Sequence, residues 1–222
     1  MKRHRICACI VNNDLEAVKE VEPLVDLFEV RIDFIGDGWR ELVKPLKKPW
    51  IACSRRVDEG GRWRGDEVGR VEELLKAIEL GADIIDLEFR TRDLRQTMEL
   101  VKLRAKCLLS FHDLTGTPPL DSLKEMVQKQ LEAGADICKV ITTAQRPEDN
   151  LTVLRLISAF PQARIVSFAM GPLGFASRVL SPLVGGDFAY ASIEPGRESA
   201  PGQITVRELS KIYEMVATVR EN

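Results

Sequence analysis

The chain has 222 residues, a length that suits either one α/β barrel or two smaller domains. Its 45% hydrophobic and 30% charged residues are ordinary for a globular protein, and a formal net charge of −2 gives no reason to expect nucleic acid or a membrane surface as a partner. No apolar run approaches the roughly 20 residues that span a bilayer.

Residues 1–5 are basic and lead directly into a strand-like stretch, so we expect no signal peptide. The five cysteines stand in apolar segments, where a reduced thiol packs as a small hydrophobe: Cys7, Cys9, Cys53, Cys107 and Cys138. Few ligands accompany them, because His4 and His112 are the only histidines. We therefore expect a reduced, cytoplasmic protein without a bound metal.

Eight short segments rich in Ile, Val, Cys and Phe alternate with amphipathic segments. The predicted strands cover residues 5–11, 27–34, 50–55, 83–89, 106–112, 136–142, 164–170 and 188–193. The spacing of Val71, Leu74 and Ile78 is typical of a helix with one buried face. The segments that follow Asp121 and Gln203 have the same periodicity.

The phrase Gly-Ala-Asp-Ile occurs at Gly81 and again at Gly134, each time between a predicted helix and a predicted strand, where glycine suits the end of a helix. Eight strand-then-helix units favour parallel strands, because parallel neighbours need a crossover connection. Eight units in this length favour a closed (β/α)8 TIM barrel, a single domain over residues 1–222. An open, doubly wound sheet is the alternative.

In such a barrel the functional site lies at the C-terminal ends of the strands. Polar residues interrupt or follow nearly every predicted strand, and the second strand carries three of them on one alternating face. These polar residues are Glu29, Arg31, Asp33, Arg55, Asp86, Glu88, His112, Lys139, Arg178, Ser199 and Gln203. A closed barrel would bring them together.

Lys139 lies inside the apolar sequence DICKVIT, on the same face as Ile137 and Ile141. Because burial disfavours an ammonium, we expect its pKa to fall towards neutrality. A neutral amine can attack a carbonyl and form a Schiff base. From the strand pattern alone, a structural ion pair with Glu88 or Asp86 explains the lysine equally well.

His112 ends the fifth predicted strand and could take and return a proton near neutral pH. Glu88, one strand earlier, is placed to accept a hydrogen bond from the other ring nitrogen and so to fix the tautomer. A core histidine with a purely structural role is the alternative.

Several of these segments together resemble the type I 3-dehydroquinate dehydratases. The matching stretches are 29–33 (EVRID), Arg55 with Glu59-Gly60-Gly61, 86–88 (DLE), 110–113 (SFHD), 135–139 (ADICK), 169–171 (AMG), 177–178 (SR) and 199–203 (SAPGQ). They occur in the family's order and cover nearly the whole chain. The resemblance implies a TIM barrel that dehydrates 3-dehydroquinate to 3-dehydroshikimate by syn elimination, in the shikimate pathway, without a cofactor.

The resemblance also implies roles for individual residues. Lys139 would form the imine, His112 would act as general acid and base, and Glu88 would orient His112. Arg178 is similar to the family's carboxylate-binding arginine. The remaining substrate positions, which hold ring hydroxyls, close the site or pack beside the ring, are Glu29, Arg31, Arg55, Ser199, Gln203 and Met170. A homodimer is implied as well.

Two features depart from the family pattern: the segment 194–198 is longer than expected, and Tyr190 stands where phenylalanine is expected. One alternative is a class I aldolase-type Schiff-base enzyme that acts on a small sugar or keto acid. The glycine-containing segments at 171–174 and 185–186 could be mistaken for the phosphate site of such an enzyme. A non-catalytic barrel is a further alternative, but such a protein would be expected to lack Lys139, His112 or Glu88.

Overall fold

Strands alternate with helices throughout residues 4–221, the part of the chain that this computed structural model describes, with side chains described as far as Thr218. The first three residues of the basic N-terminal segment, and Asn222, fall outside that part. The strands are β1 (Ile6–Ile10), β2 (Leu27–Arg31), β3 (Trp50–Cys53), β4 (Ile84–Glu88), β5 (Lys106–His112), β6 (Ile137–Thr143), β7 (Ile165–Met170) and β8 (Ala189–Ser192).

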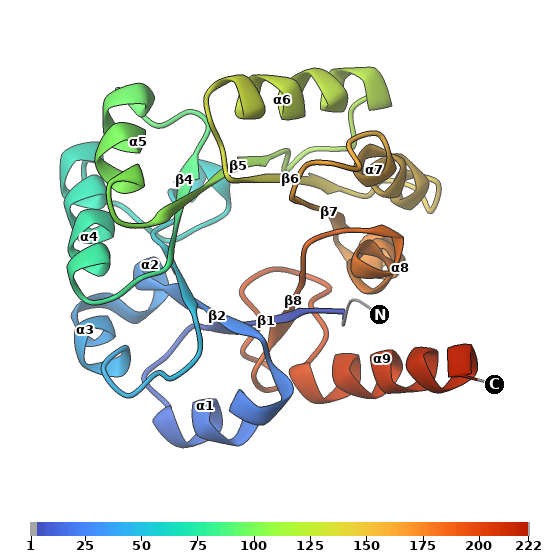
Figure 1. Ribbon diagram of the computed structural model, residues 1–222, viewed down its shortest axis with the longest axis horizontal. Coiled ribbons are helices and arrows are strands. Elements are labelled where there is room, and N and C mark those ends of the chain that lie inside the picture. Colours follow the sequence, from blue (N-terminus) through green and yellow to red (C-terminus); the bar gives the residue numbers. More distant parts are fainter. Residues whose placement is uncertain (1–3, 222) are drawn as a thin grey trace.

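The helices surround the strands (Figure 1). They are α1 (Leu15–Val21), α2 (Ile32–Ile35), α3 (Trp39–Leu42), α4 (Glu67–Glu79), α5 (Leu94–Lys102), α6 (Leu120–Glu132), α7 (Asp149–Ser158), α8 (Phe175–Leu180) and α9 (Val206–Glu221). Short 3-10 turns lie between them: η1 (Glu22–Leu24), η2 (Gly36–Gly38), η3 (Val57–Glu59), η4 (Pro172–Gly174) and η5 (Ser181–Val184). Each helix within residues 4–221 is too short or too polar to cross a membrane.

The strands form one parallel sheet in the order β7-β6-β5-β4-β3-β2-β1-β8. Within residues 4–221 no ladder joins β7 to β8, but the backbone N–H of Asp187 donates to the carbonyl of Ile165 at 2.8 Å where these two strands begin. The sheet therefore curls into a nearly closed ring (Figure 1). The predicted (β/α)8 barrel is confirmed, and the open, doubly wound alternative is wrong.

The second predicted strand, 27–34, is longer than the observed one. β2 ends at Arg31, and the chain turns directly into α2. Asp33 then lies in a helical turn, where its carboxylate accepts two hydrogen bonds from the Arg31 guanidinium, at 2.9 and 2.8 Å. The alternating face therefore carries Glu29 and Arg31 as predicted, but not Asp33.

The repeated Gly-Ala-Asp phrase has a double role. Gly81 and Gly134 have φ angles of +95° and +96°, and each ends a helix in the left-handed conformation that glycine adopts without strain. Asp83 and Asp136 then accept hydrogen bonds from the backbone N–H groups of Trp50 and Cys107, near the starts of the preceding strands, at 3.0 and 2.8 Å. The phrase thus stops a helix and attaches the next strand to the sheet.

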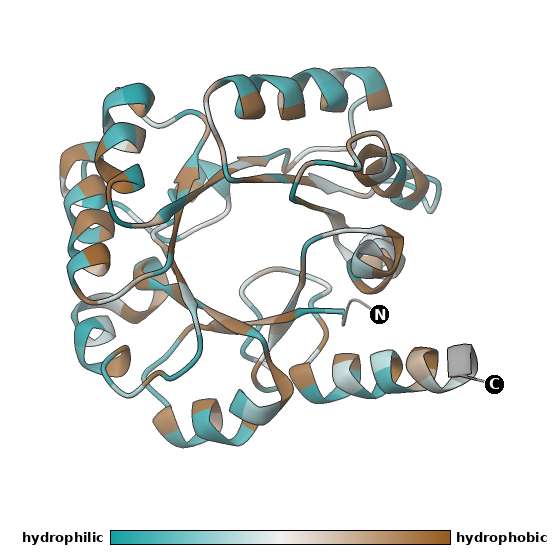
Figure 2. Ribbon diagram, in the orientation of Figure 1, coloured by the Kyte–Doolittle hydropathy of each residue, from teal (hydrophilic) through white to brown (hydrophobic). Residues whose placement is uncertain are grey.

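Apolar residues occupy the strands and the helix sides that face them (Figure 2). Inside the barrel, each of the strands β2 to β6 points an apolar residue towards its beginning and, two positions later, a polar or sulfur-containing one. Leu27 and Glu29 on β2 are one such pair, and Ile137 and Lys139 on β6 are another. The apolar layer packs the base of the barrel and leaves the polar layer beneath the ends of the strands.

All five cysteines are buried, and within residues 4–221 they form no disulfide. Cys7 and Cys9 pack inside the barrel, whereas Cys107 and Cys138 pack between the sheet and the helices. The prediction that the thiols act as small core residues is confirmed.

Candidate active site

A cavity of about 270 Å³ opens at the C-terminal ends of the strands. Nine of the ten residues predicted for the site line it: Glu29, Arg31, Arg55, His112, Lys139, Met170, Arg178, Ser199 and Gln203. They come from β2, β5, β6, β7, α8 and the segments after β3 and β8. The prediction that the barrel brings these residues together is confirmed. The tenth, Glu88, is fully buried outside the cavity wall.

Lys139 points into the cavity from β6 and uses all three hydrogen-bond donors of an ammonium group. They go to Asp86 Oδ2 at 3.0 Å, to Glu29 Oε1 at 3.2 Å and to the Tyr190 hydroxyl at 3.0 Å. Burial alone would lower the pKa of Lys139, but Asp86 and Glu29 outweigh burial and hold this pKa above its usual value. The expected fall towards neutrality is therefore wrong: the ion pair with Asp86 is present and keeps Lys139 as an ammonium.

Asp86 is the anion on which this cluster depends. Its carboxylate also accepts hydrogen bonds from Arg55 Nη2 and from the Ser110 hydroxyl, both at 2.6 Å. Burial alone would raise the pKa of Asp86, but Arg55 and Lys139 outweigh it and hold this pKa well below its usual value. Asp86 therefore stays ionised and fixes both cations.

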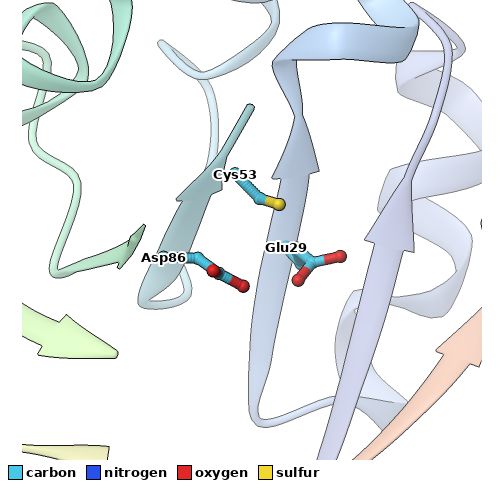
Figure 3. Close-up of side chains that lie close together, drawn as sticks. All are labelled: Glu29, Cys53 and Asp86. Atoms are coloured by element: carbon cyan, nitrogen blue, oxygen red, sulfur yellow. The ribbon is translucent and has the colours of Figure 1, made fainter. Parts of the chain in front are cut away.

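Glu29, Cys53 and Asp86 lie close together on the neighbouring strands β2, β3 and β4 (Figure 3). Their side-chain oxygen and sulfur atoms lie within 4.8 Å of one another, a spacing at which such groups can hold a metal ion. Here the two carboxylates already bind the Lys139 ammonium, and burial raises the pKa of the Cys53 thiol well above its usual value, so the sulfur is protonated. The two carboxylates are therefore the anionic partners of Lys139, and Cys53 is a neutral neighbour.

His112 is hydrogen-bonded through Nδ1 to Glu59 Oε2 at 3.0 Å. Glu88 instead accepts the backbone N–H of Arg56 at 2.9 Å and lies 3.6 Å from Arg55 Nη1. The predicted contact between Glu88 and His112 is therefore wrong. Glu59, from a turn after β3, takes the place at Nδ1 that was predicted for Glu88. Glu88 instead stabilises that turn through its hydrogen bond with the N–H of Arg56.

The His112–Glu59 pair has opposed pKa shifts with one main cause. Burial lowers the pKa of His112 well below its usual value, and nearby Arg55 and Lys139 act in the same direction. Burial also raises the pKa of Glu59 to about 7. An ionised Glu59 accepts the Nδ1 proton and leaves the lone pair of Nε2 available, so the neutral imidazole can act as a base.

Glu59 reaches the site because two glycines fold the chain back after η3. Gly60 has a φ angle of +82°, and at Gly61 a Cβ atom would lie 2.1 Å from the carbonyl oxygen of Arg55. The N–H of Trp63 closes the turn by donating to that same oxygen at 2.9 Å. The two glycines after Glu59 indicated a tight turn in the sequence, although no role was predicted for Glu59.

Arg178, on α8, brings a buried cation to the cavity wall. The residue is 2% exposed, and its guanidinium stacks 4.4 Å from the centre of the Phe168 ring and donates through Nη2 to the carbonyl of Pro201 at 2.9 Å. Its Nε has no hydrogen-bond partner among the described residues. Burial lowers the pKa of Arg178 to about 10, so the group keeps its charge at neutral pH. A buried cation with an unused donor favours an anionic ligand.

The segment after β8 covers this wall. Gln203 Oε1 accepts hydrogen bonds from the backbone N–H of Ser199 at 2.8 Å and from its hydroxyl at 3.2 Å. Gly202 has a φ angle of +76° and packs so closely on Gly171 that a Cβ atom there would lie 2.7 Å from the Gly171 carbonyl oxygen. Ser199 and Gln203 are thus held over the cavity as one unit, and Met170 lines the cavity beside them.

The chain is similar to known proteins over nearly its whole length. The model of the type I 3-dehydroquinase family matches residues 6–219. The chain is 41% identical to a 3-dehydroquinate dehydratase of Dehalococcoides mccartyi over 218 residues, 97% of each chain, and 34% identical to one of Methanocaldococcus jannaschii, over 95% of this chain and 98% of the relative. The solved Geobacillus kaustophilus 3-dehydroquinate dehydratase is 25% identical, with a TM-score of 0.85 over 98% of this chain and 92% of that one.

Proposed function

Because the chain belongs to the type I 3-dehydroquinase family, we propose that Lys139 and His112 perform the family's reaction in the cavity described above. That reaction is the dehydration of 3-dehydroquinate to 3-dehydroshikimate, a hydro-lyase step of the shikimate pathway. Membership sets aside the aldolase-type and non-catalytic alternatives. The observation that carries the residue assignment is one cavity that holds a buried lysine, a neutral histidine paired with a carboxylate, and a buried arginine with an unused donor.

Lys139 condenses with the ketone of the substrate and gives an iminium ion. The iminium is an electron sink, so a proton on the neighbouring carbon becomes acidic enough for the neutral His112 to remove. The enamine that results expels the β-hydroxyl group, and the protonated His112 returns its proton to that leaving group. One residue serves both steps, so the proton and the hydroxyl leave from the same face of the ring.

Arg178 binds the substrate carboxylate, since it lines the cavity, its buried Nε has no hydrogen-bond partner, and the cavity holds no other unpaired cation among the described residues. Ser199 and Gln203 bring hydrogen-bonding groups to the ring hydroxyls from the segment after β8. Arg31 and Glu29 do so from β2, and Arg55 helps by fixing Asp86, while Met170 packs against the ring. Tight positioning of this kind supplies a large part of the rate enhancement.

We also propose that the enzyme acts in the cytoplasm as a homodimer. Five buried cysteines without a disulfide suit a reducing compartment. A surface for the second copy is offered by exposed apolar side chains on α7, η4, α8 and η5, elements that contact one another: Leu151, Leu173, Phe175, Leu180 and Val184.

Trapping with sodium borohydride tests the imine. The protein is incubated with 3-dehydroquinate and the reductant, digested, and mapped by mass spectrometry. We expect a covalent mass increase confined to the peptide that contains Lys139, because only an imine is reduced to a stable amine. Labelling elsewhere, or turnover with no labelling at all, would disprove the assignment.

His112→Ala separates the two residue roles in the same assay. It should still trap the imine at Lys139 while its turnover falls by about 100-fold or more, the usual contribution of a positioned proton donor and acceptor. His4→Ala, which alters the chain's other histidine, is the matched control and should behave as the unmodified protein. If His112→Ala keeps full turnover, the proton-transfer role is wrong.

A further inference from the structure

Tyr190 occupies the interior of the barrel directly beside the reacting amine. It lies on β8 opposite Cys7 of β1, is 4% exposed, and lines the cavity. Its ring meets the rings of Phe168 and Phe188 edge to face, with centres 6.2 and 5.2 Å apart. These contacts hold the ring in one orientation and aim the hydroxyl at Lys139.

The Tyr190 hydroxyl is the one uncharged partner of the Lys139 ammonium. Its oxygen accepts a hydrogen bond from Nζ at 3.0 Å, and Nζ lies 4.3 Å from the centre of the ring. The phenol makes this hydrogen bond as an acceptor and no other among the described residues, so its own O–H remains available to a ligand in the cavity.

We propose that the Tyr190 hydroxyl relays protons from Lys139 to the ketone oxygen of the substrate while the imine forms, and back while it is hydrolysed. The proposal rests on the proposed function, because it needs a ketone at Lys139. The hydroxyl is also what distinguishes Tyr190 from the phenylalanine that the family resemblance led us to expect at this position.

The proton balance of imine formation calls for such a relay. An ammonium has no lone pair, so Nζ must lose one proton before it attacks, and the ketone oxygen must gain two before it leaves as water. Over the whole step, ammonium plus ketone gives protonated imine plus water, and both protons of that water come from Nζ. A hydroxyl that contacts Nζ is within reach of an oxygen on the carbon to which Nζ bonds. It can accept a proton from nitrogen as it gives its own to oxygen, and so return to its starting state.

Asp86, the anionic partner of Lys139 at 3.0 Å, is a poorer intermediary. Asp86 is bound by Arg55 and Ser110 and its pKa is held well below the usual range, so a protonated Asp86 is strongly disfavoured. Burial raises the pKa of Tyr190 well above its usual value, with Glu29 acting in the same direction. The phenol therefore stays protonated and neutral. A group that relays protons must gain one proton as it gives up another, and a neutral phenol can do this.

Tyr190→Phe removes this oxygen and keeps the ring beneath Nζ. The variant is mixed rapidly with 3-dehydroquinate, quenched with borohydride at successive times, and the labelled Lys139 peptide is quantified. We expect the rate constant for labelling to fall about 10- to 100-fold, within the range of a lost proton-transfer group. The final labelled fraction should not change, because a relay lowers the barrier in both directions and leaves the equilibrium where it was.

Tyr213→Phe is the matched control, because Tyr213 is the chain's other tyrosine, is also buried, and donates to the carbonyl of Val179 at 3.0 Å, whereas Tyr190 accepts from Lys139. It should label at the unmodified rate. An unchanged rate in Tyr190→Phe overturns the relay, and so does a lower final fraction at an unchanged rate, which would mean that Tyr190 only holds Lys139 in place. Failure of the unmodified protein to label at Lys139 would instead disprove the proposed function itself.

Discussion

Glu59 and His112 share a hydrogen bond at the cavity wall, and the charge of Glu59 decides what His112 can do. Above pH 7 the carboxylate is ionised, accepts the Nδ1 proton and stabilises the imidazolium that forms when Nε2 takes a proton. As the pH falls through about 7, Glu59 gains a proton and this stabilisation disappears. His112 itself stays neutral across this interval, because its pKa lies well below 6.5.

Glu59→Gln should therefore change both the rate and its pH dependence. The amide keeps a hydrogen-bonding group near Nδ1 but has no negative charge, so we expect kcat to fall at least about 10-fold with a smaller change in KM. In the unmodified protein kcat should decline below about pH 7, and in the variant this acid limb should disappear or move to lower pH. A profile of kcat between pH 5 and 9 measures both, and an acid limb that stays near 7 in the variant would contradict the assignment.

Single residues were predictable where they broke an apolar pattern. Lys139 and His112 stand out in strand sequences, and both line the cavity. The pKa of Lys139 was mispredicted because the ion pair with Asp86 was treated as an alternative to an active lysine and Glu29 was not considered as a partner; only the folded barrel fixes the distances of both carboxylates from Nζ. Glu88 was assigned to His112 because it lies on the adjacent strand, whereas Glu59 arrives from a turn that no strand pattern predicts.

At the scale of elements, the turn from Arg56 to Trp63 delivers a site residue by folding back onto the end of β3. Gly61 is packed against the backbone of Arg55, so the positions of Arg55 and Glu59 depend on the absence of a side chain there. Such close packing of backbone on backbone cannot be read from composition, although two glycines after a glutamate are consistent with it.

Gly61→Ala should lower kcat at least about 10-fold, because its Cβ would force the turn off Arg55, and a misplacement of about 1 Å in a site can cost about 100-fold. Gly81→Ala is the control: its φ of +95° costs about 1–2 kcal/mol of stability, but a Cβ there meets nothing within 4 Å. That variant should melt at a lower temperature and keep its kcat. Equal losses of kcat in both variants would show that general destabilisation, rather than the turn, is responsible.

At the scale of the whole molecule, eight strand-and-helix units were enough to predict the barrel, because a parallel sheet of that size in one short chain closes on itself. The sequence pattern could not show that, within the described residues, β7 and β8 are not paired by a ladder of hydrogen bonds. These two strands meet through one backbone hydrogen bond where they begin and through the rings of Phe168 and Tyr190 inside the barrel. Nor could the sequence pattern show which apolar residues remain outside, because that depends on how α7 and α8 pack against β7 and β8.

The exposed apolar residues on α7, η4, α8 and η5 lead to a prediction about the oligomeric state. If α7, η4, α8 and η5 meet a second copy, the particle in solution should have twice the chain mass of 24.9 kDa. Leu151→Glu places a carboxylate on this surface, where burial without a partner is costly, so we expect the dimer dissociation constant to rise at least about 100-fold. Leu103→Glu, at a 77% exposed leucine beyond the end of α5, should leave it unchanged. Sedimentation equilibrium measures both, and a monomeric unmodified protein at micromolar concentration, or equal dissociation in both variants, would rule out this surface as the interface.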